Sequence, residues 1–136
     1  MTSQLYTLQG IILQLERSIR VVRRLPRLPR LDSKLLRGVI ADFLKDLSHL
    51  AVFSQREGLG SEHLYNTIMR CSRVFTEVGR AVSTLEALAE LQKVDLSTAV
   101  KKFAEVLAED SCLEDLEKAL LELKKQGLNL QRKISA

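Results

Sequence analysis

The chain has few of the residues that interrupt helices or stabilise non-helical folds. Its 136 residues include no tryptophan, two prolines, two cysteines and six glycines. Cys71 and Cys112 are too few for a disulfide framework and lack the CxxC spacing of a zinc site, so we expect both to be small, partly buried hydrophobic residues. Because 26 residues are leucine, the composition favours helix over strand.

Long apolar runs and a targeting segment are also missing. No run approaches the roughly 18–20 apolar residues that cross a bilayer, and the start of the chain lacks the charged-then-apolar layout of a signal peptide. We therefore expect an intracellular, cytoplasmic protein with no transmembrane segment. A length of 136 residues fits one domain, which we place at residues 1–127, followed by a C-terminal tail at residues 128–136.

Signatures of catalysis and of metal binding are absent as well. The sequence has no Gly-rich phosphate loop, HExxH or GxSxG motif, and its two histidines are His49 and His63. Asp46 and His49 have the i, i+3 spacing of half a carboxylate–histidine metal motif, but no second half accompanies them. The alternating charges of residues 114–125 are typical of a solvated helix face with weak pairs. We expect no enzymatic activity, no cofactor and no metal site.

Apolar residues at alternating steps of three and four predict long amphipathic helices. In the first helix the seam consists of Leu5, Leu8, Ile12, Leu15, Ile19 and Val22. We expect this helix over residues 3–25, where Pro26 and Pro29 stop it. A second helix should begin at a cap formed by Asp32 or Ser33 and end near Gly58 and Gly60. Ser61 should cap a third helix, which runs to about Lys93.

The last part of the chain predicts two shorter helices, because the step of six from Leu107 to Leu113 breaks the phase of the apolar stripe. The expected boundary residues are Asp95 as the cap of the first, Ser111 with Glu114 as a capping box of the second, and Gly127 as its end. The fold expected from these elements is an all-α, antiparallel bundle of four to five helices. The coiled-coil-like seams also suit self-association.

Positive charge is concentrated in one segment. Residues 1–80 carry 13 basic and 7 acidic side chains, whereas residues 81–136 carry 8 basic and 10 acidic ones. Residues 17–37 hold eight basic side chains against a single acid, Asp32. The segment begins at Arg17, and the candidate cationic contacts within it, to a protein partner or to phosphates, are Arg20, Arg23, Arg24, Arg27, Arg30, Lys34 and Arg37.

Three interpretations of this segment remain open. It can bind the phosphate backbone of a nucleic acid, although no aromatic residue lies between Tyr6 and Phe43 to stack on bases. It also resembles the proline-rich ligands of SH3 domains through Arg23, Leu25, Pro26, Leu28 and Pro29. The third interpretation is a basic connector that Leu25, Leu28 and Leu31 anchor to the bundle while its arginines meet water, an acidic partner or, less favourably, anionic lipid.

From these observations we expect a non-enzymatic interaction module, an adaptor or small subunit of a larger complex. It would contact a protein partner, or a second copy of itself, through apolar helix stripes and the arginine-rich segment. The alternative hypothesis is an accessory nucleic-acid-binding subunit that contacts backbone phosphates through residues 17–37.

Overall fold

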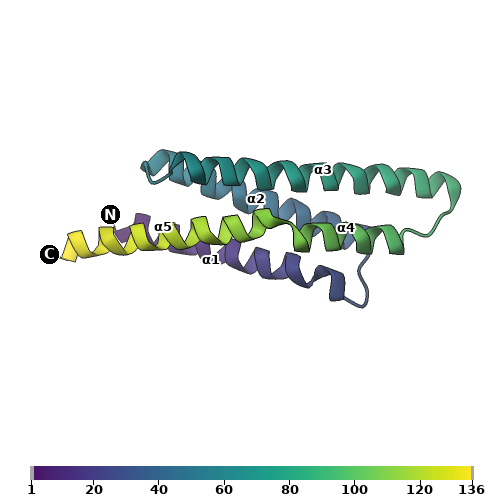
Figure 1. Cartoon of the computed structure of the whole chain (residues 1–136), viewed down its shortest axis with the longest axis horizontal. Helices are drawn as coiled ribbons and strands as arrows, with labels where there is room; N and C mark the ends of the chain where they lie inside the picture. The colour runs from purple at the N-terminus through teal and green to yellow at the C-terminus, as the bar shows by residue number, and fades with distance from the viewer. Residues whose placement is uncertain (1, 136) are drawn as a thin grey trace.

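The chain folds into an antiparallel helical bundle. The computed structural model describes the backbone of residues 2–135 and the side chains of residues 7–127. Its elements are α1 (Thr2–Arg24), the 3-10 helix η1 (Leu25–Arg27), α2 (Ser33–Glu57), α3 (Glu62–Gln92), α4 (Ser97–Glu109) and α5 (Ser111–Ser135). Successive helices α1, α2 and α3 reverse direction, and α4 with α5 forms the returning fourth arm (Figure 1). The expected all-α bundle is confirmed, and residues 2–135 contain no strand.

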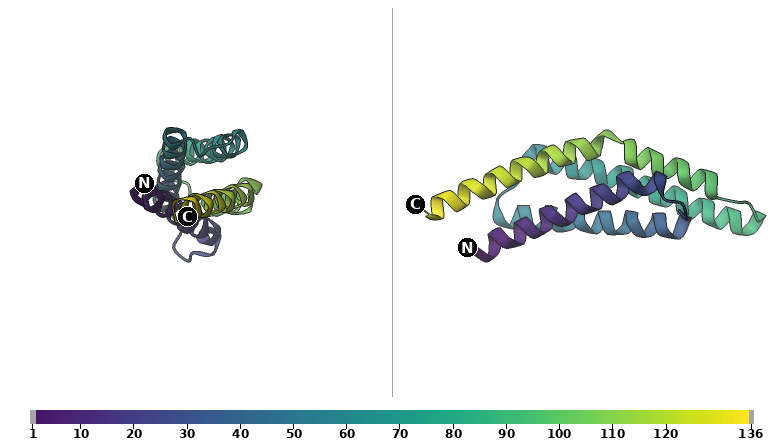
Figure 2. Two further views of the ribbon diagram at one scale, coloured as in Figure 1. Left: turned by 90° about the vertical axis from the view of Figure 1, so that its left-hand side faces the viewer. Right: turned by 90° about the horizontal axis from the view of Figure 1, so that it is seen from below.

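The fourth arm is bent where α4 meets α5, as the view from below in Figure 2 shows. The bend falls at Asp110, whose extended backbone (φ −66°, ψ 134°) separates the two helices. The predicted break is therefore confirmed, although α5, with 25 residues, is as long as α2 rather than shorter. Both ends of the described chain lie at the same end of the bundle, where α1 begins and α5 finishes.

Caps and stop signals of the first three helices follow the sequence closely. A carboxylate oxygen of Asp32 accepts from the backbone N–H three residues on at 2.7 Å, and the Ser61 hydroxyl does the same at 3.1 Å. These contacts satisfy amides that the first turn of a helix leaves free. Gly58 ends α2 in the left-handed conformation at φ 65°, which glycine adopts without strain. Lys93 ends α3 in the same conformation at φ 54°.

Two boundary predictions for α5 are wrong. Ser111 does not form a capping box with Glu114; it is the first residue of α5, and Asp110 instead accepts a hydrogen bond from the backbone N–H of Cys112 at 2.8 Å. Gly127 does not end the helix, which continues to Ser135. An interior glycine costs about 1 kcal/mol relative to alanine, which is too little to stop a helix that packs against α1. The side chains of the expected tail, residues 128–136, lie outside the described part.

Asp95 was predicted to be the N-cap of α4, but it lies one residue before the N-cap. The N-cap residue is Leu96, whose side chain makes no capping bond, and Asp95 accepts instead from the backbone N–H and the hydroxyl of Ser97, both at 3.0 Å. These two hydrogen bonds, the backbone one being the stronger cause, lower the pKa of the Asp95 carboxyl.

The predicted seams form the core. Phe43 of α2 and Phe75 of α3 stack at its centre with ring centroids 4.1 Å apart and an angle of 18° between the rings. Around them lie the buried seam residues Leu8, Ile12, Leu15, Ile19, Val22, Leu36, Ile40, Leu47, Leu50, Leu64, Ile68, Val78, Val82, Val100, Leu107, Leu113, Leu116, Leu120 and Leu123. Most of the described seam side chains are thus buried within the chain's own core. The side chain of Leu5 lies outside the described residues.

Both cysteines belong to this core, more deeply than the sequence indicated. Cys71 and Cys112 are free thiols with no exposed surface, and Cys71 donates a hydrogen bond from Sγ to the carbonyl oxygen of Cys112 at 3.2 Å. The hydrogen bond with the Cys71 side chain and then burial raise the pKa of the Cys112 thiol. The two thiols therefore act as packing residues between α3 and α5.

Gly79 marks a close approach of α3 to α2. A Cβ atom placed on Gly79 would lie 3.4 Å from Cγ2 of Ile40, which is an ordinary van der Waals contact. The position of Ile40 shows that α2 passes close to this glycine.

Candidate functional site

The basic segment forms one exposed surface, which we call the arginine surface. It consists of the side chains of Arg17, Arg20, Arg23, Arg24, Arg27, Arg30, Lys34 and Arg37. These residues come from the second half of α1, the connector through η1 and the first turns of α2. All eight side chains are exposed, and they lie on consecutive segments of the chain.

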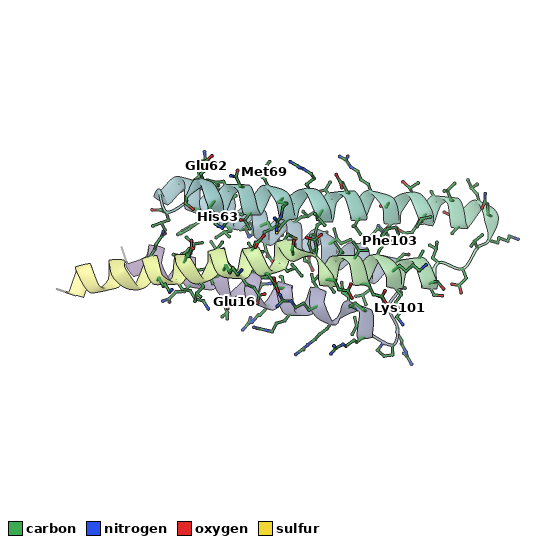
Figure 3. All side chains as sticks on the ribbon, viewed as in Figure 1. Glu16, Glu62, His63, Met69, Lys101 and Phe103 are labelled. Atoms are coloured by element: carbon green, nitrogen blue, oxygen red, sulfur yellow. The ribbon has the colours of Figure 1, made fainter. Side chains whose placement is uncertain are left out.

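Helix geometry places three of these arginines in a row on α1. Arg17, Arg20 and Arg24 follow at steps of three and four, which puts them on one side of a helix over about 10 Å. The opposite side carries the buried seam, including Ile19 and Val22. The core therefore holds the row facing outward, and nitrogen-tipped side chains project from this part of the molecule in Figure 3.

Two members of the arginine surface are held by ion pairs to other helices. Arg23 pairs with Glu117 of α5. Arg37 Nε lies 2.5 Å from a carboxylate oxygen of Glu86 on α3, and Glu86 also accepts from Ser33 Oγ at 3.0 Å. Within residues 7–127 the other six members, Arg17, Arg20, Arg24, Arg27, Arg30 and Lys34, have no ion-pair partner.

Apolar side chains interleave with these free cations. Leu13, Val21, Leu28 and Leu35 are each 40–47% exposed. The connector is anchored by the fully buried Leu25 and the partly buried Leu31, whereas the expected third anchor, Leu28, points into solvent. The arginine surface thus offers both positive charge and apolar contact area, a combination suited to protein partners.

No aromatic residue in the described part of the chain joins this surface. Phe43 and Phe75 are buried in the core, while Phe53 and Phe103 pack partly against it. Figure 3 shows Phe103 on the side of α4 that faces α3, and Lys101 on the side that faces α1 and the connector. Lys101 is an exposed cation on α4, the helix that packs against η1.

The proline-containing segment is not displayed as an SH3 ligand. Such a ligand must offer an extended polyproline II strand. Here Leu25 is fully buried within a 3-10 turn that includes Pro26, and Arg23 is part of α1. Leu28, which follows this turn, has an extended backbone with φ −72° and ψ 130°. Binding in that mode would require Leu25 to leave the core.

Asp46 and His49 line a groove between α1 and α2. Asp46 is 8% exposed and accepts a hydrogen bond from Ser18 Oγ of α1 at 2.5 Å, whereas His49 is exposed. The groove has a volume of about 490 Å³, and Arg17 and Lys45 bring positive charge to its walls. Among residues 7–127, no three His, Cys, Asp or Glu side chains are arranged to hold a metal ion.

The charged face of α5 pairs with other helices, which was not expected from its sequence. Glu117 meets Arg23 of α1, and Asp115 meets Arg70 of α3. The hydrogen bond that Arg70 donates to Asp115 is the main cause that raises the pKa of Arg70. Neighbour spacing along one helix suggested weak pairs within α5, but the seam turns these carboxylates toward the adjacent helices.

Comparisons with models of protein families, with curated proteins and with solved structures find no match for this chain. None of the helices in the described part of the chain combines the length and the hydropathy that a bilayer crossing requires.

Proposed function

We propose that the chain is a non-enzymatic interaction module whose arginine surface binds an acidic protein partner. The observation that carries this proposal is the set of six exposed basic side chains without an ion-pair partner among residues 7–127. Like charges held close together repel one another, and an acidic partner relieves that repulsion. The interleaved apolar residues would add contact area that persists at high salt.

Burial of the seams means that the proposed protein partner would contact other residues. Most seam side chains in the described part are buried in the core, so a partner would meet the arginine surface with Leu13, Val21, Leu28 and Leu35. An amphipathic helix with glutamates and leucines on one face matches this mixture. Self-association through the same surface is disfavoured, because it would bring two sets of unpaired arginines together.

Nucleic-acid binding is the second candidate, because the row of Arg17, Arg20 and Arg24 suits contact with successive phosphates. Such contact would not include base stacking, since the described part of this surface has no aromatic side chain.

Fluorescence anisotropy with two probes separates the two candidates. One probe is a synthetic helical peptide with glutamate and leucine on one face, and the other is a mixed-sequence DNA duplex, each at low and moderate salt. Replacing Arg20, Arg24 and Arg27 by glutamate should weaken binding of the peptide about ten-fold or more. The matched control replaces the exposed Arg56, Arg73 and Arg80 by glutamate, which changes the net charge equally.

The proposal stands if the peptide binds, retains affinity at moderate salt and responds to the first variant alone. It fails if the duplex binds more tightly, loses affinity steeply with salt and responds to the first variant, which is the behaviour of phosphate contacts. It also fails if both triple variants weaken the peptide equally, because net charge would then explain binding. Light scattering of the protein alone at both salt concentrations measures self-association.

A further inference from the structure

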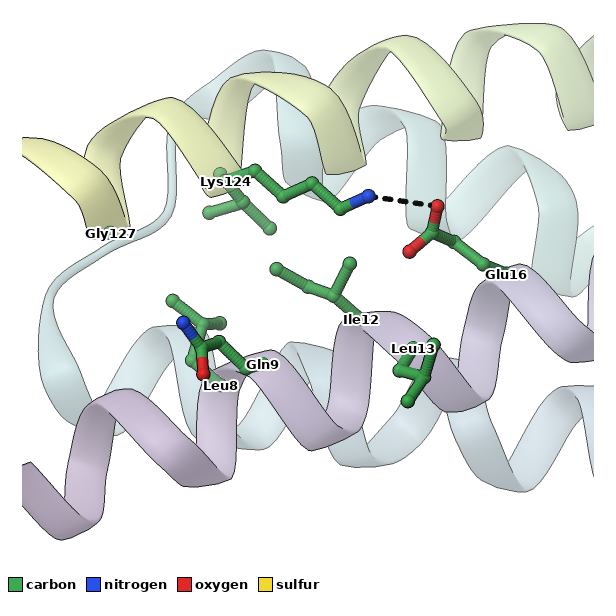
Figure 4. A pocket seen from close by; sticks show the side chains of 8 residues that line it. Leu8, Gln9, Ile12, Leu13, Glu16, Lys124 and Gly127 are labelled. Carbon is green, nitrogen blue, oxygen red and sulfur yellow. Dashed lines mark hydrogen bonds and ion pairs between the residues drawn. The ribbon is translucent and has the colours of Figure 1, made fainter.

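An apolar cavity of about 370 Å³ lies between α1 and α5, at the end of the bundle where the chain begins and finishes. Leu8 and Ile12 of α1 and Leu123 of α5 line it, and Gly127 contributes no side chain to fill it (Figure 4). Its volume falls in the range of about 300–1,000 Å³ that small-molecule sites occupy. The cavity is therefore large enough for a small apolar group.

One ion pair closes the rim of this cavity. The stem of Lys124 extends above Ile12 in Figure 4, and its Nζ atom lies 2.9 Å from a carboxylate oxygen of Glu16. The two side chains are 45% and 30% exposed. A pair so open to water contributes at most about 1 kcal/mol, so the lysine can exchange one carboxylate for another.

The length of the cavity limits the ligand to a medium chain. Leu8 and Glu16 are eight residues apart on α1, which corresponds to about 12 Å at the helical rise. An extended hydrocarbon chain with bonds of about 1.5 Å covers that distance with roughly ten carbons. The hydrocarbon would lie on the leucine and isoleucine side chains, with its polar end at the rim.

The surroundings of the ion pair favour an anionic head group over a cationic one. If a ligand takes Lys124, Glu16 can pair instead with Arg20 at i+4, which has no ion pair among the described residues. If a ligand instead takes Glu16, Lys124 has no acidic residue three or four positions away on α5. Only the anionic ligand leaves every charge compensated.

We propose that this cavity binds a single-chain fatty acid of medium length, with its carboxylate on Lys124. The aliphatic chain occupies the space that Gly127 leaves between α1 and α5. This site borders the arginine surface at Leu13 and Arg20, but its test does not depend on the proposed protein partner.

Decanoate is the probe, titrated into the full-length chain and followed by amide shifts in ¹H–¹⁵N spectra. Decyltrimethylammonium, which has the same chain and the opposite charge, serves as the ligand control. Lys124→Met should weaken decanoate binding about five-fold, and Glu16→Gln should strengthen it about two- to five-fold. The matched control is Lys125→Met, because Lys125 is exposed on the same helix but does not line the cavity.

A side chain at position 127 provides a steric test. Gly127→Val should abolish decanoate binding by filling the cavity, and circular dichroism shows whether the variant folds. Should it not fold, Gly127→Ala provides the smaller obstruction and should weaken binding. The proposal is supported when amide shifts concentrate in residues 8–16 and 123–127 and the charge variants act as stated. It is overturned by equal binding of both amphiphiles, by an unaltered affinity in Lys124→Met, or by no binding below the micelle concentration.

Discussion

Replacing Gly79 by alanine tests how closely α2 and α3 approach each other. Glycine in a helix interior is about 1 kcal/mol less favourable than alanine, so the substitution gains that amount unless the new methyl group collides with α2. The structure places the new Cβ atom 3.4 Å from Cγ2 of Ile40, in ordinary contact and without overlap. We therefore expect Gly79→Ala to raise the free energy of unfolding by about 0.5–1 kcal/mol.

Gly38 provides the matched control, because it lies inside α2 with nothing within 4 Å of an added Cβ atom. Gly38→Ala should gain about 1 kcal/mol from helix propensity alone. Urea denaturation followed by circular dichroism measures both variants, and each gain corresponds to a rise in Tm of about 3–5 °C for a chain of this size. The larger side chain in Gly79→Val should destabilise by about 1–3 kcal/mol, because its methyl groups would overlap Ile40.

One pattern of results would refute this reasoning. If Gly38→Ala stabilises the protein while Gly79→Ala destabilises it by more than about 1 kcal/mol, the two helices lie closer together than in the structure. If neither alanine stabilises, the assumption that helix propensity governs both positions is wrong.

Three further predictions concern the core, a thiol and an ion pair. Phe43→Ala should lower the free energy of unfolding by about 3–5 kcal/mol in urea denaturation, because it removes a fully buried ring stacked on Phe75; a loss below 1 kcal/mol would show that the centre of the bundle is not packed as described. The folded state raises the pKa of Cys112, so the associated stability is complete below the ordinary thiol pKa of about 8.5 and falls as the pH rises above it. Cys112→Ala should flatten this alkaline decline in a pH series of melting curves, and an unchanged slope would contradict the assignment. For Arg70 and Asp115, which are both partly exposed, a double-mutant cycle should give a coupling of about 0.2–1 kcal/mol that shrinks in high salt; coupling unaffected by salt would argue against an ion pair.

Local signals in the sequence were sufficient for most of the fold. The steps of three and four identified the buried seams, and Asp32, Gly58 and Ser61 marked helix ends because capping depends on residues within one turn. The prediction that Gly127 ends a helix was wrong because the surroundings of Gly127 include α1, more than a hundred residues away in the sequence. A lone glycine signals a helix end only when nothing distant favours continuing the helix.

The candidate site was predicted in composition but not in arrangement. The sequence identified all eight basic residues, yet it could not show that Arg23 and Arg37 are paired with Glu117 and Glu86. These partners lie on α5 and α3, and no short-range pattern connects them to the basic segment. The same limitation applies to the contact between α4 and η1, which no short-range pattern predicts.

The contact between the first and last helices has a consequence for the order in which the chain can fold. The ion pairs of α5 with α1 join residues 94 and 108 positions apart, and closing a loop of that length costs about 4 kcal/mol of chain entropy plus a constant. In contrast, α2 and α3 are joined by residues 58–61 and can pair as soon as both exist. On a ribosome, the α1–α2 and α2–α3 hairpins would therefore form early, because α1 also packs against α2. The part of the apolar face of α1 that α5 covers would stay uncovered until α5 has emerged. That waiting interval is when this chain is most exposed to aggregation or to capture by a chaperone.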